Sequence, residues 1–356
     1  MRRLFTAFCA LVAIAGIFWS CSRTRPPRPL VSSTERPPKI ESCGECHSEL
    51  VRQFQSSPHN SALTQPSGEV ARRFTAAESL TAGVHFVERD GRLVAQSEEN
   101  SLHVDWIFGS GRHAQTPVSV LTGPDGRLEL IEHRVSWYPD GGLAPTLNLP
   151  PESPAIDSGL QTFGALHGPS AAQECFSCHS SHLIHEVGRP PHDVITGVGC
   201  VRCHVRAGEH LLAIENDVLS IDRWSDLSPL ESINRCGECH RRADHFTSDE
   251  LVPENPSLAR FAPVGLSLSA CFRRQDELSH RNGKRRRLDC MTCHDPHVAA
   301  SRTGKAYRDA CVTCHGSSNR DAPECSVETT DSNCIPCHMR KVPANDMLQF
   351  TDHWIR

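Results

Sequence analysis

One five-residue pattern, Cys-x-x-Cys-His, occurs seven times in this chain of 356 residues. In chain order, the first to seventh motifs begin at Cys43, Cys175, Cys200, Cys236, Cys290, Cys311 and Cys334. Composition alone would give far fewer than one such match in a chain of this length. Each motif fixes two thiols and an imidazole in one short segment, and that combination is the attachment signature of a c-type haem. The repeat therefore constrains the fold more than any other feature does.

The chemistry of haem attachment explains the spacing. Two thiols add to the two vinyl groups of one porphyrin, and the adjacent histidine can bind the iron as proximal ligand. The sequence therefore predicts seven covalently attached haem c groups. The predicted attachment cysteines are Cys43, Cys46, Cys175, Cys178, Cys200, Cys203, Cys236, Cys239, Cys290, Cys293, Cys311, Cys314, Cys334 and Cys337. The predicted proximal ligands are His47, His179, His204, His240, His294, His315 and His338.

Two other uses of paired cysteines compete with haem. The fifth and sixth motifs, at Cys290 and Cys311, have the spacing of a zinc ribbon. A disulfide framework in an exported chain is the other alternative. Neither requires a histidine after every cysteine pair, so both leave the most regular part of the pattern unexplained.

The amino terminus predicts export. Arg2 and Arg3 precede an apolar run over residues 4–19, which suits a signal peptide or lipoprotein signal over residues 1–21. Cys21 is the candidate lipidation site, and ordinary cleavage or an uncleaved anchor stay open as alternatives. Residues 22–40 are proline-rich and charged and predict an extended linker. We therefore expect a periplasmic or otherwise extracytoplasmic protein, with a lipoprotein anchor as one route to the membrane.

The composition favours a fold built around cofactors. Aromatic residues make up 6% and hydrophobic residues 38% of the chain, which is little apolar surface for this length. Porphyrins would supply the missing apolar area, so we expect a mostly α-helical, loop-rich fold organised around haems. Hairpin signals at Asp90-Gly91 and at Pro124-Asp125-Gly126 predict a small β-rich insert over residues 71–150. A first haem module over 41–70 would precede it, and a six-haem module over 151–356 would follow.

Each iron also has a second axial position. Methionine is nearly excluded as its ligand, because the chain has only four methionines and one of them is the initiator. Histidine is abundant, at 21 residues, and fourteen of these lie outside the motifs. His59, which follows the first motif, is the first candidate for a distal ligand.

Several segments resemble a known family. CGECHSELVRQFQSSPH, FGSGRHAQTPV, GVGCVRCHVRAGEH, CMTCHDPH and CHMRKVPANDMLQFTDHWI are similar to segments of the multihaem c-type cytochromes related to the tetrahaem acceptor of hydroxylamine oxidoreductase. The resemblance covers about residues 41–356; its haem motifs are highly specific and its linking motifs are moderately specific. It implies distal ligation by His59, His113, His210, His297 and His353. VRAGEH departs from the glycine-proline-glycine run expected after CVRCH. Some of these cytochromes carry tetratricopeptide repeats, and we expect no such repeat domain here. The resemblance therefore implies electron transfer without naming a partner.

Two further distal ligands would complete a set of seven. We favour His167 and His185, with His182 and His192 as alternatives. His85, His103 and His133 lie in the β-rich insert and are expected to be structural or exposed, and the roles of His245 and His280 stay open. Cys271 and Cys325 remain outside the motifs and either pair with each other or stay unpaired.

The predicted function is electron transfer through a chain of bis-histidine haems, with no catalytic residue. One alternative is an oxidoreductase acting on a small nitrogen or sulfur compound at one open haem. Another is a structural subunit of a membrane redox complex. No motif carries lysine in place of histidine, and the chain has only two tyrosines, both of which weigh against the enzyme. The expected partners are membrane-associated redox proteins; with a formal net charge of -5, no nucleic acid is expected.

Overall fold

A computed structural model describes most of the chain after the predicted export signal. The described residues are 40–76, 83–149, 159–181, 194–214, 223–275, 287–315 and 333–356. The predicted signal, Cys21, nearly all of the 22–40 linker, His182, His185, His192, His280 and Cys325 lie outside them. Within these ranges, no helix is both long enough and apolar enough to cross a membrane.

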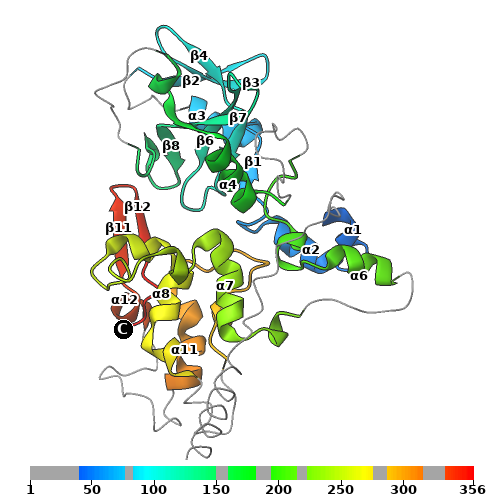
Figure 1. Ribbon diagram of the computed structural model, residues 1–356, viewed down its shortest axis with the longest axis vertical. Coiled ribbons are helices and arrows are strands. Elements are labelled where there is room, and N and C mark those ends of the chain that lie inside the picture. Colours follow the sequence, from blue (N-terminus) through cyan, green and yellow to red (C-terminus); the bar gives the residue numbers. More distant parts are fainter. Residues whose placement is uncertain are drawn as a thin grey trace, which may run out of the picture. The chain divides into compact units, whose positions relative to one another are not determined.

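A β-rich region follows the first haem motif (Figure 1). Its largest sheet is antiparallel, in the order β1, β5, β6, β7, β10. Those strands are β1 (Leu63–Thr64), β5 (Trp106–Phe108), β6 (Thr116–Thr122), β7 (Leu128–His133) and β10 (Gly164–His167). A three-stranded sheet contains β2 (His85–Arg89), β3 (Arg92–Gln96) and β4 (Ser101–His103), and a third pairs β8 (Val135–Tyr138) with β9 (Gly142–Pro145).

Both predicted hairpins are confirmed. Strands β2 and β3 pair from His85 with Gln96 to Arg89 with Arg92, around the two-residue turn at Asp90 and Gly91. These two residues have φ angles of 51° and 72°, the left-handed conformation that a tight primed turn requires. The second hairpin joins β6 to β7 through the turn that contains Gly126, at φ 78°.

The sheet extends beyond the predicted insert at both ends. Leu63 of β1 pairs with Phe108, and Gly164 of β10 pairs with His133. The segments on either side of residues 71–150 therefore form edge strands of the five-stranded sheet. These edges are too short to give a period-two pattern in the sequence, so the hairpins were predictable and the edge strands were not.

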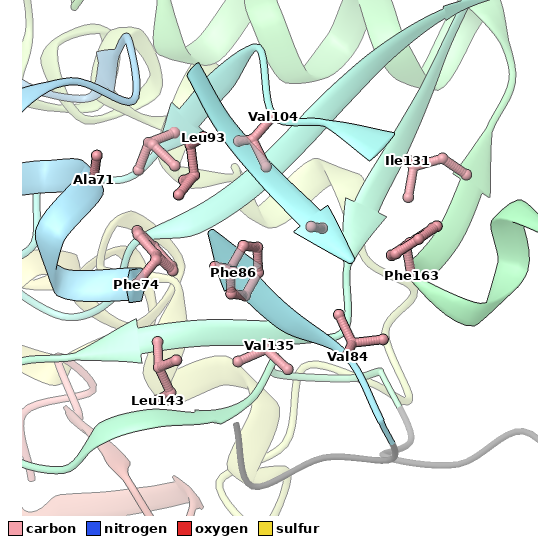
Figure 2. Close-up of a cluster of buried hydrophobic side chains, with 12 residues drawn as sticks. Ala71, Phe74, Val84, Phe86, Leu93, Val104, Ile131, Val135, Leu143 and Phe163 are labelled. Carbon is pink, nitrogen blue, oxygen red and sulfur yellow. The ribbon is translucent and has the colours of Figure 1, made fainter. Parts of the chain in front are cut away.

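The apolar core of the β-rich region lies between its sheets and helix α3 (Gly68–Thr75) (Figure 2). Phe74 is fully buried and packs edge-to-face on Phe86, with their ring centroids 5.3 Å apart. Leu93 and Ile131 are also fully buried in this cluster. Aromatic and branched aliphatic side chains together thus form the core of this region.

The rest of the described chain consists of short helices, 3-10 turns and one hairpin. The α-helices are α1 (Ile40–Gly44), α2 (Ser48–Gln55), α4 (Pro169–His179), α5 (Cys200–Cys203), α6 (Ala207–Ile214), α7 (Pro229–His240), α8 (Ala262–Leu268), α9 (Ala270–Arg273), α11 (Arg308–His315) and α12 (Ile335–His338). The 3-10 turns are η1 (Leu160–Thr162), η2 (Trp224–Asp226), η3 (Ala243–His245), η4 (Pro256–Arg260), η5 (Cys290–Thr292) and η6 (Gly304–Tyr307). Strands β11 (Lys341–Asn345) and β12 (Leu348–Thr351) form the hairpin. The fold is therefore a combination of short helices and small sheets.

Helix α7 shows how the sequence sets the ends of these helices. Ser228 accepts a hydrogen bond from the backbone N–H of Glu231, whose side chain accepts one from the Ser228 N–H in return. Pro229 occupies the first turn, where its missing N–H has no cost. The helix ends at His240, and Arg241 follows with a left-handed φ of 64°. The fourth haem motif thus forms the last turn of a well-capped helix.

His133 is a buried titratable group in the β-rich region. Its Nε2 lies 2.8 Å from Ser119 Oγ, and its ring centroid lies 5.8 Å from that of Phe86. Among the described residues, its buried Nδ1 has no hydrogen-bond partner. Burial lowers the pKa of His133 to about 3. The imidazole is therefore neutral in the folded protein.

This burial predicts an acid-sensitive β-rich region. The unfolded chain takes up a proton at His133 below about pH 6.5, whereas the folded chain does so only near pH 3. Stability is therefore complete above the unfolded pKa and falls between these values, by up to about 1.4 kcal/mol per pH unit. Urea denaturation of His133→Gln, followed by circular dichroism, should give a shallower pH slope than the unsubstituted protein gives. The exposed control His85→Gln should keep the original slope, and equal slopes for His133→Gln and the unsubstituted protein would contradict the prediction.

Candidate haem-binding sites

All seven motifs lie on helical turns or at helix ends. Helices α4, α7, α11 and α12 end on the motif histidines His179, His240, His315 and His338, and α5 spans the two cysteines of the third motif. The first and fifth motifs make the same turn, because the His47 and His294 N–H groups each donate to the carbonyl of the first cysteine at 2.9 Å. Side chains at positions i, i+3 and i+4 of a helical turn share one face. Both thiols and the imidazole of a motif can therefore face a single group.

Cysteines of different motifs also lie close together. Cys43 hydrogen-bonds Cys200, which lowers the pKa of the Cys43 thiol to about 7. Cys178 hydrogen-bonds Cys239, which lowers the pKa of the Cys178 thiol to about 6. The same kind of contact joins Cys236 to Cys290 and Cys311 to Cys334. The attachment sites therefore cluster, although the motifs are far apart in sequence.

Three motif histidines each face a histidine from another segment. His240 and His59 have ring centroids 6.2 Å apart, with ring planes at 70°. His204 and His297 are 6.4 Å apart and almost parallel, at 9°. His294 and His353 are 6.2 Å apart, at 44°. In each pair the partner is one of the distal ligands that the sequence predicted.

The spacing in these pairs fits a shared metal ion. Imidazole–metal bonds are about 2 Å long, so two rings bound on opposite sides of one ion have centres about 6 Å apart. The angle between the ring planes can vary freely about that axis. The three pairs share the spacing and differ in angle. The residues present therefore fit a bis-histidine haem iron, and the paired cysteines on the same turns fit its covalent attachment.

Hydrogen bonds select the nitrogen that is available to such an ion. Four histidines have Nδ1 against a backbone carbonyl: His59 with Pro296 at 3.2 Å, His179 with Ala62 at 2.9 Å, His338 with Arg356 at 2.6 Å and His353 with Thr351 at 2.9 Å. A carbonyl only accepts, so Nδ1 carries the proton and Nε2 keeps its lone pair. His297 Nδ1 similarly lies 2.8 Å from a carboxylate oxygen of Asp295. A second-shell hydrogen bond of this kind is typical of metal-binding histidines.

One short turn, at Asp295 and Pro296, positions a histidine in each of two pairs. The Pro296 carbonyl holds His59, and the Asp295 carboxylate holds His297. Those two histidines face the fourth and third motifs respectively. The sequence analysis missed Asp295 and Pro296 as positioning residues, although their place inside CHDPH was a usable signal.

The other predicted distal ligands are not paired in this way. His210, at the middle of α6, has a buried Nδ1 without a hydrogen-bond partner among the described residues and lies near His204. His113 is exposed, 5.8 Å from the Phe350 ring, close to Arg112, Arg302 and Lys341. Both remain predictions as ligands. His185 lies outside the described residues.

His167 is held by a different interaction. It lies on β10 of the five-stranded sheet, and its Nε2 is 2.9 Å from a carboxylate oxygen of Glu132 on β7. The nitrogen that a haem iron would need is thus engaged in a cross-strand pair. The structure lends His167 no support as a distal ligand.

The other histidines and the cysteine outside the motifs lie in several parts of the fold. His85, His103 and His133 lie on strands of the β-rich region, and His245 lies in η3 beside Asp244. Cys271 is half-buried near Cys293 and Cys314, and burial raises the pKa of its thiol. Its predicted partner Cys325 lies outside the described residues.

Neither a zinc site nor a disulfide framework is found in the described part of the chain. No three His, Cys, Asp or Glu side chains converge there as metal ligands. This includes the four cysteines of the zinc-ribbon alternative, all of which are described. No disulfide joins two described cysteines.

Comparisons with known proteins give one structural resemblance. No known family and no curated protein sequence matches the chain. Among solved structures, the chain is similar to an outer cell wall cytochrome, OcwA, with a TM-score of 0.49 and 12% sequence identity. The match covers 89% of this chain and 78% of OcwA. At that level of similarity, the case for haem comes from this chain's own cysteines and histidines.

The ring pairs predict the effect of removing one partner. In haem-loaded protein, His59→Ala should convert one low-spin iron into a high-spin iron, because His240 would lose its partner across the metal. Electron paramagnetic resonance (EPR) of the oxidised protein measures this. The matched control is His245→Ala, a partly exposed histidine beside Asp244, which should leave the spectrum unchanged. An all-low-spin spectrum for His59→Ala would show that His59 is not a ligand.

Proposed function

We propose that the protein is an extracytoplasmic multihaem c-type cytochrome that carries electrons through seven covalently bound haems. The observation that carries this proposal is the set of three histidine pairs, each made of one motif histidine and one histidine from a distant segment. All three pairs have a spacing that is compatible with one metal ion between the rings. The seven Cys-x-x-Cys-His motifs supply the attachment chemistry.

The chain's own residues would fix the haems and set their potentials. Haem supplies one-electron chemistry when bound, and an imidazole on each side of the iron keeps the potential lower than a methionine sulfur would. The Nδ1 hydrogen bonds of His59, His297 and His353 orient their rings and increase the basicity of Nε2. Low potentials and closed coordination suit a carrier that passes electrons between redox proteins.

The proposal predicts the mass of the mature protein. Seven motifs should add about 4.3 kDa of covalent haem to the processed chain. Intact-mass spectrometry of protein made with a haem-attachment system measures this, and a pyridine haemochrome spectrum gives an independent haem count. Bound zinc without covalent haem would refute the proposal.

An oxidoreductase is the second candidate, and a specific observation identifies where its reactive haem would lie. The motif histidines His47, His179, His315 and His338 face no second histidine ring among the described residues. His179 instead has the Phe108 ring 5.0 Å away, edge-on. We place the candidate open haem at this second motif.

Carbon monoxide distinguishes carrier from enzyme. It binds reduced haem only where one axial position is open, so a carrier with seven closed irons should bind none. A titration of the reduced protein, followed by absorption spectroscopy, gives the number of open sites. Binding at one full equivalent would favour the oxidoreductase, and its loss in a Cys175→Ser, Cys178→Ser variant would assign the site to the second motif.

Location outside the cytoplasm is part of the proposal. Haem attachment of this kind normally takes place there, and the apolar run over residues 4–19 is the export signal. If Cys21 is lipidated, Cys21→Ala should move the protein from the membrane fraction to the soluble fraction after cell fractionation. Continued pelleting with membranes would assign the anchor to the apolar run or to a partner protein.

A further inference from the structure

The fourth motif, at the end of α7, lies against three other motifs. Its first contact is with the second motif: the Cys239 thiol hydrogen-bonds Cys178. The Cys178 Sγ also lies 4.0 Å from the carbonyl oxygen of Glu238. Helices α4 and α7 therefore meet at their motif ends.

A second contact joins the fourth motif to the fifth. The Cys236 thiol hydrogen-bonds Cys290, which opens η5 directly after Asp289. Asp289 is buried and holds this turn by accepting hydrogen bonds from the Met291 and Thr292 N–H groups. Cys290 is thus fixed in place beside α7.

A third contact reaches the third motif. Cys203 lies near enough to Cys236 for the charge on one thiol to affect the other. Trp224 links the same segments: its Nε1 donates to the Cys203 carbonyl at 3.3 Å, and the Arg235 guanidinium lies 5.3 Å from the centre of its ring. Arg235 immediately precedes Cys236, so this contact fixes the approach of the two motifs.

Further thiol contacts extend from the third and the fifth motifs. Cys43 of the first motif contacts Cys200 of the third. Cys293 of the fifth motif lies near Cys314 of the sixth. Cys311 of the sixth motif contacts Cys334 of the seventh. The fourth motif is thus in contact with three other motifs, the second, the third and the fifth.

We propose that the fourth motif, Cys236 to His240, is the junction of a branched haem array. The main line runs through the first, third, fourth, fifth, sixth and seventh motifs, and the second motif branches from the fourth. This inference rests on the proposed function, because it concerns the order in which the same seven sites exchange electrons. Transfer between the three ends of the array then passes through the fourth motif.

The three ends differ in their surroundings. His47 and His338, at the first and seventh motifs, are exposed, so partner proteins can approach these two ends. The second motif lies on α4, whose Phe176 is fully buried against Phe108, Val118 and Leu130 of the β-rich region. The side branch is thus covered by the five-stranded sheet, and the main line is open at both ends.

Deleting single haems tests the junction. Neighbouring haems a few ångströms apart influence each other's redox potential through their charges. In a Cys236→Ser, Cys239→Ser variant, intact mass should show six haems, and redox titration followed by EPR should show shifts for three of them. In the matched variant Cys334→Ser, Cys337→Ser, which removes the end of the main line, only one should shift. Shifts for two or fewer haems in the junction variant would overturn the inference.

A milder pair of substitutions covers the case in which the junction variant does not fold. His59→Ala keeps all attachment cysteines and puts a high-spin iron at the fourth motif, and His353→Ala does the same at the fifth. The first should perturb the EPR signals of three low-spin haems and the second those of two. Equal effects, or no high-spin iron in His59→Ala, would contradict the junction.

Different results would refute the proposed function and the branched order of the haems. Absence of covalent haem from the unsubstituted protein would refute the proposed function itself. Seven covalent haems together with one or two shifted neighbours in the junction variant would refute only the branched order.

Discussion

The proposed bis-histidine irons impose one geometric requirement: each needs two imidazoles on opposite sides, and one chain segment supplies only one of them. The helical turn of each motif puts two thiols and one histidine on a single face. The opposite ring must come from elsewhere, and in the three observed pairs it lies 59 or more residues away in the sequence (353 − 294 = 59 for the nearest pair). His59 reaches the fourth motif, His297 reaches the third and His353 reaches the fifth. These pairings connect segments that lie far apart in the sequence.

The same requirement explains why the chain combines two kinds of core. The β-rich region carries a conventional apolar core of Phe74, Phe86, Leu93 and Ile131 and needs no cofactor. In the part that carries the later motifs, buried apolar residues such as Ile233 and Val264 lie beside contacts between motif thiols, as between Cys239 and Cys178. We expect haem attachment to add apolar contact area to that part and so to stabilise its fold.

Much of the candidate site could be predicted from the sequence, because its chemistry is encoded locally. The motif cysteines and histidines follow from a five-residue pattern, and the hairpin at Asp90-Gly91 follows from its turn residues. The pairing of His59 with His240 could not be predicted, because nothing in a single sequence records which distant segment reaches which iron. His167 illustrates the same limit: it was chosen for its position before Cys175, whereas a cross-strand carboxylate from Glu132 occupies its Nε2. The edge strands β1 and β10 are likewise set by tertiary pairing and not by local pattern.

The central claim is that irons lie between histidines of distant segments, and a crystal structure of the haem-loaded protein, phased on the anomalous signal of iron, tests it most directly. The account predicts iron peaks between His59 and His240, between His204 and His297, and between His294 and His353, each within about 2 Å of both Nε2 atoms. Iron peaks beside His240, His204 and His294 with other residues in the opposite positions would contradict it.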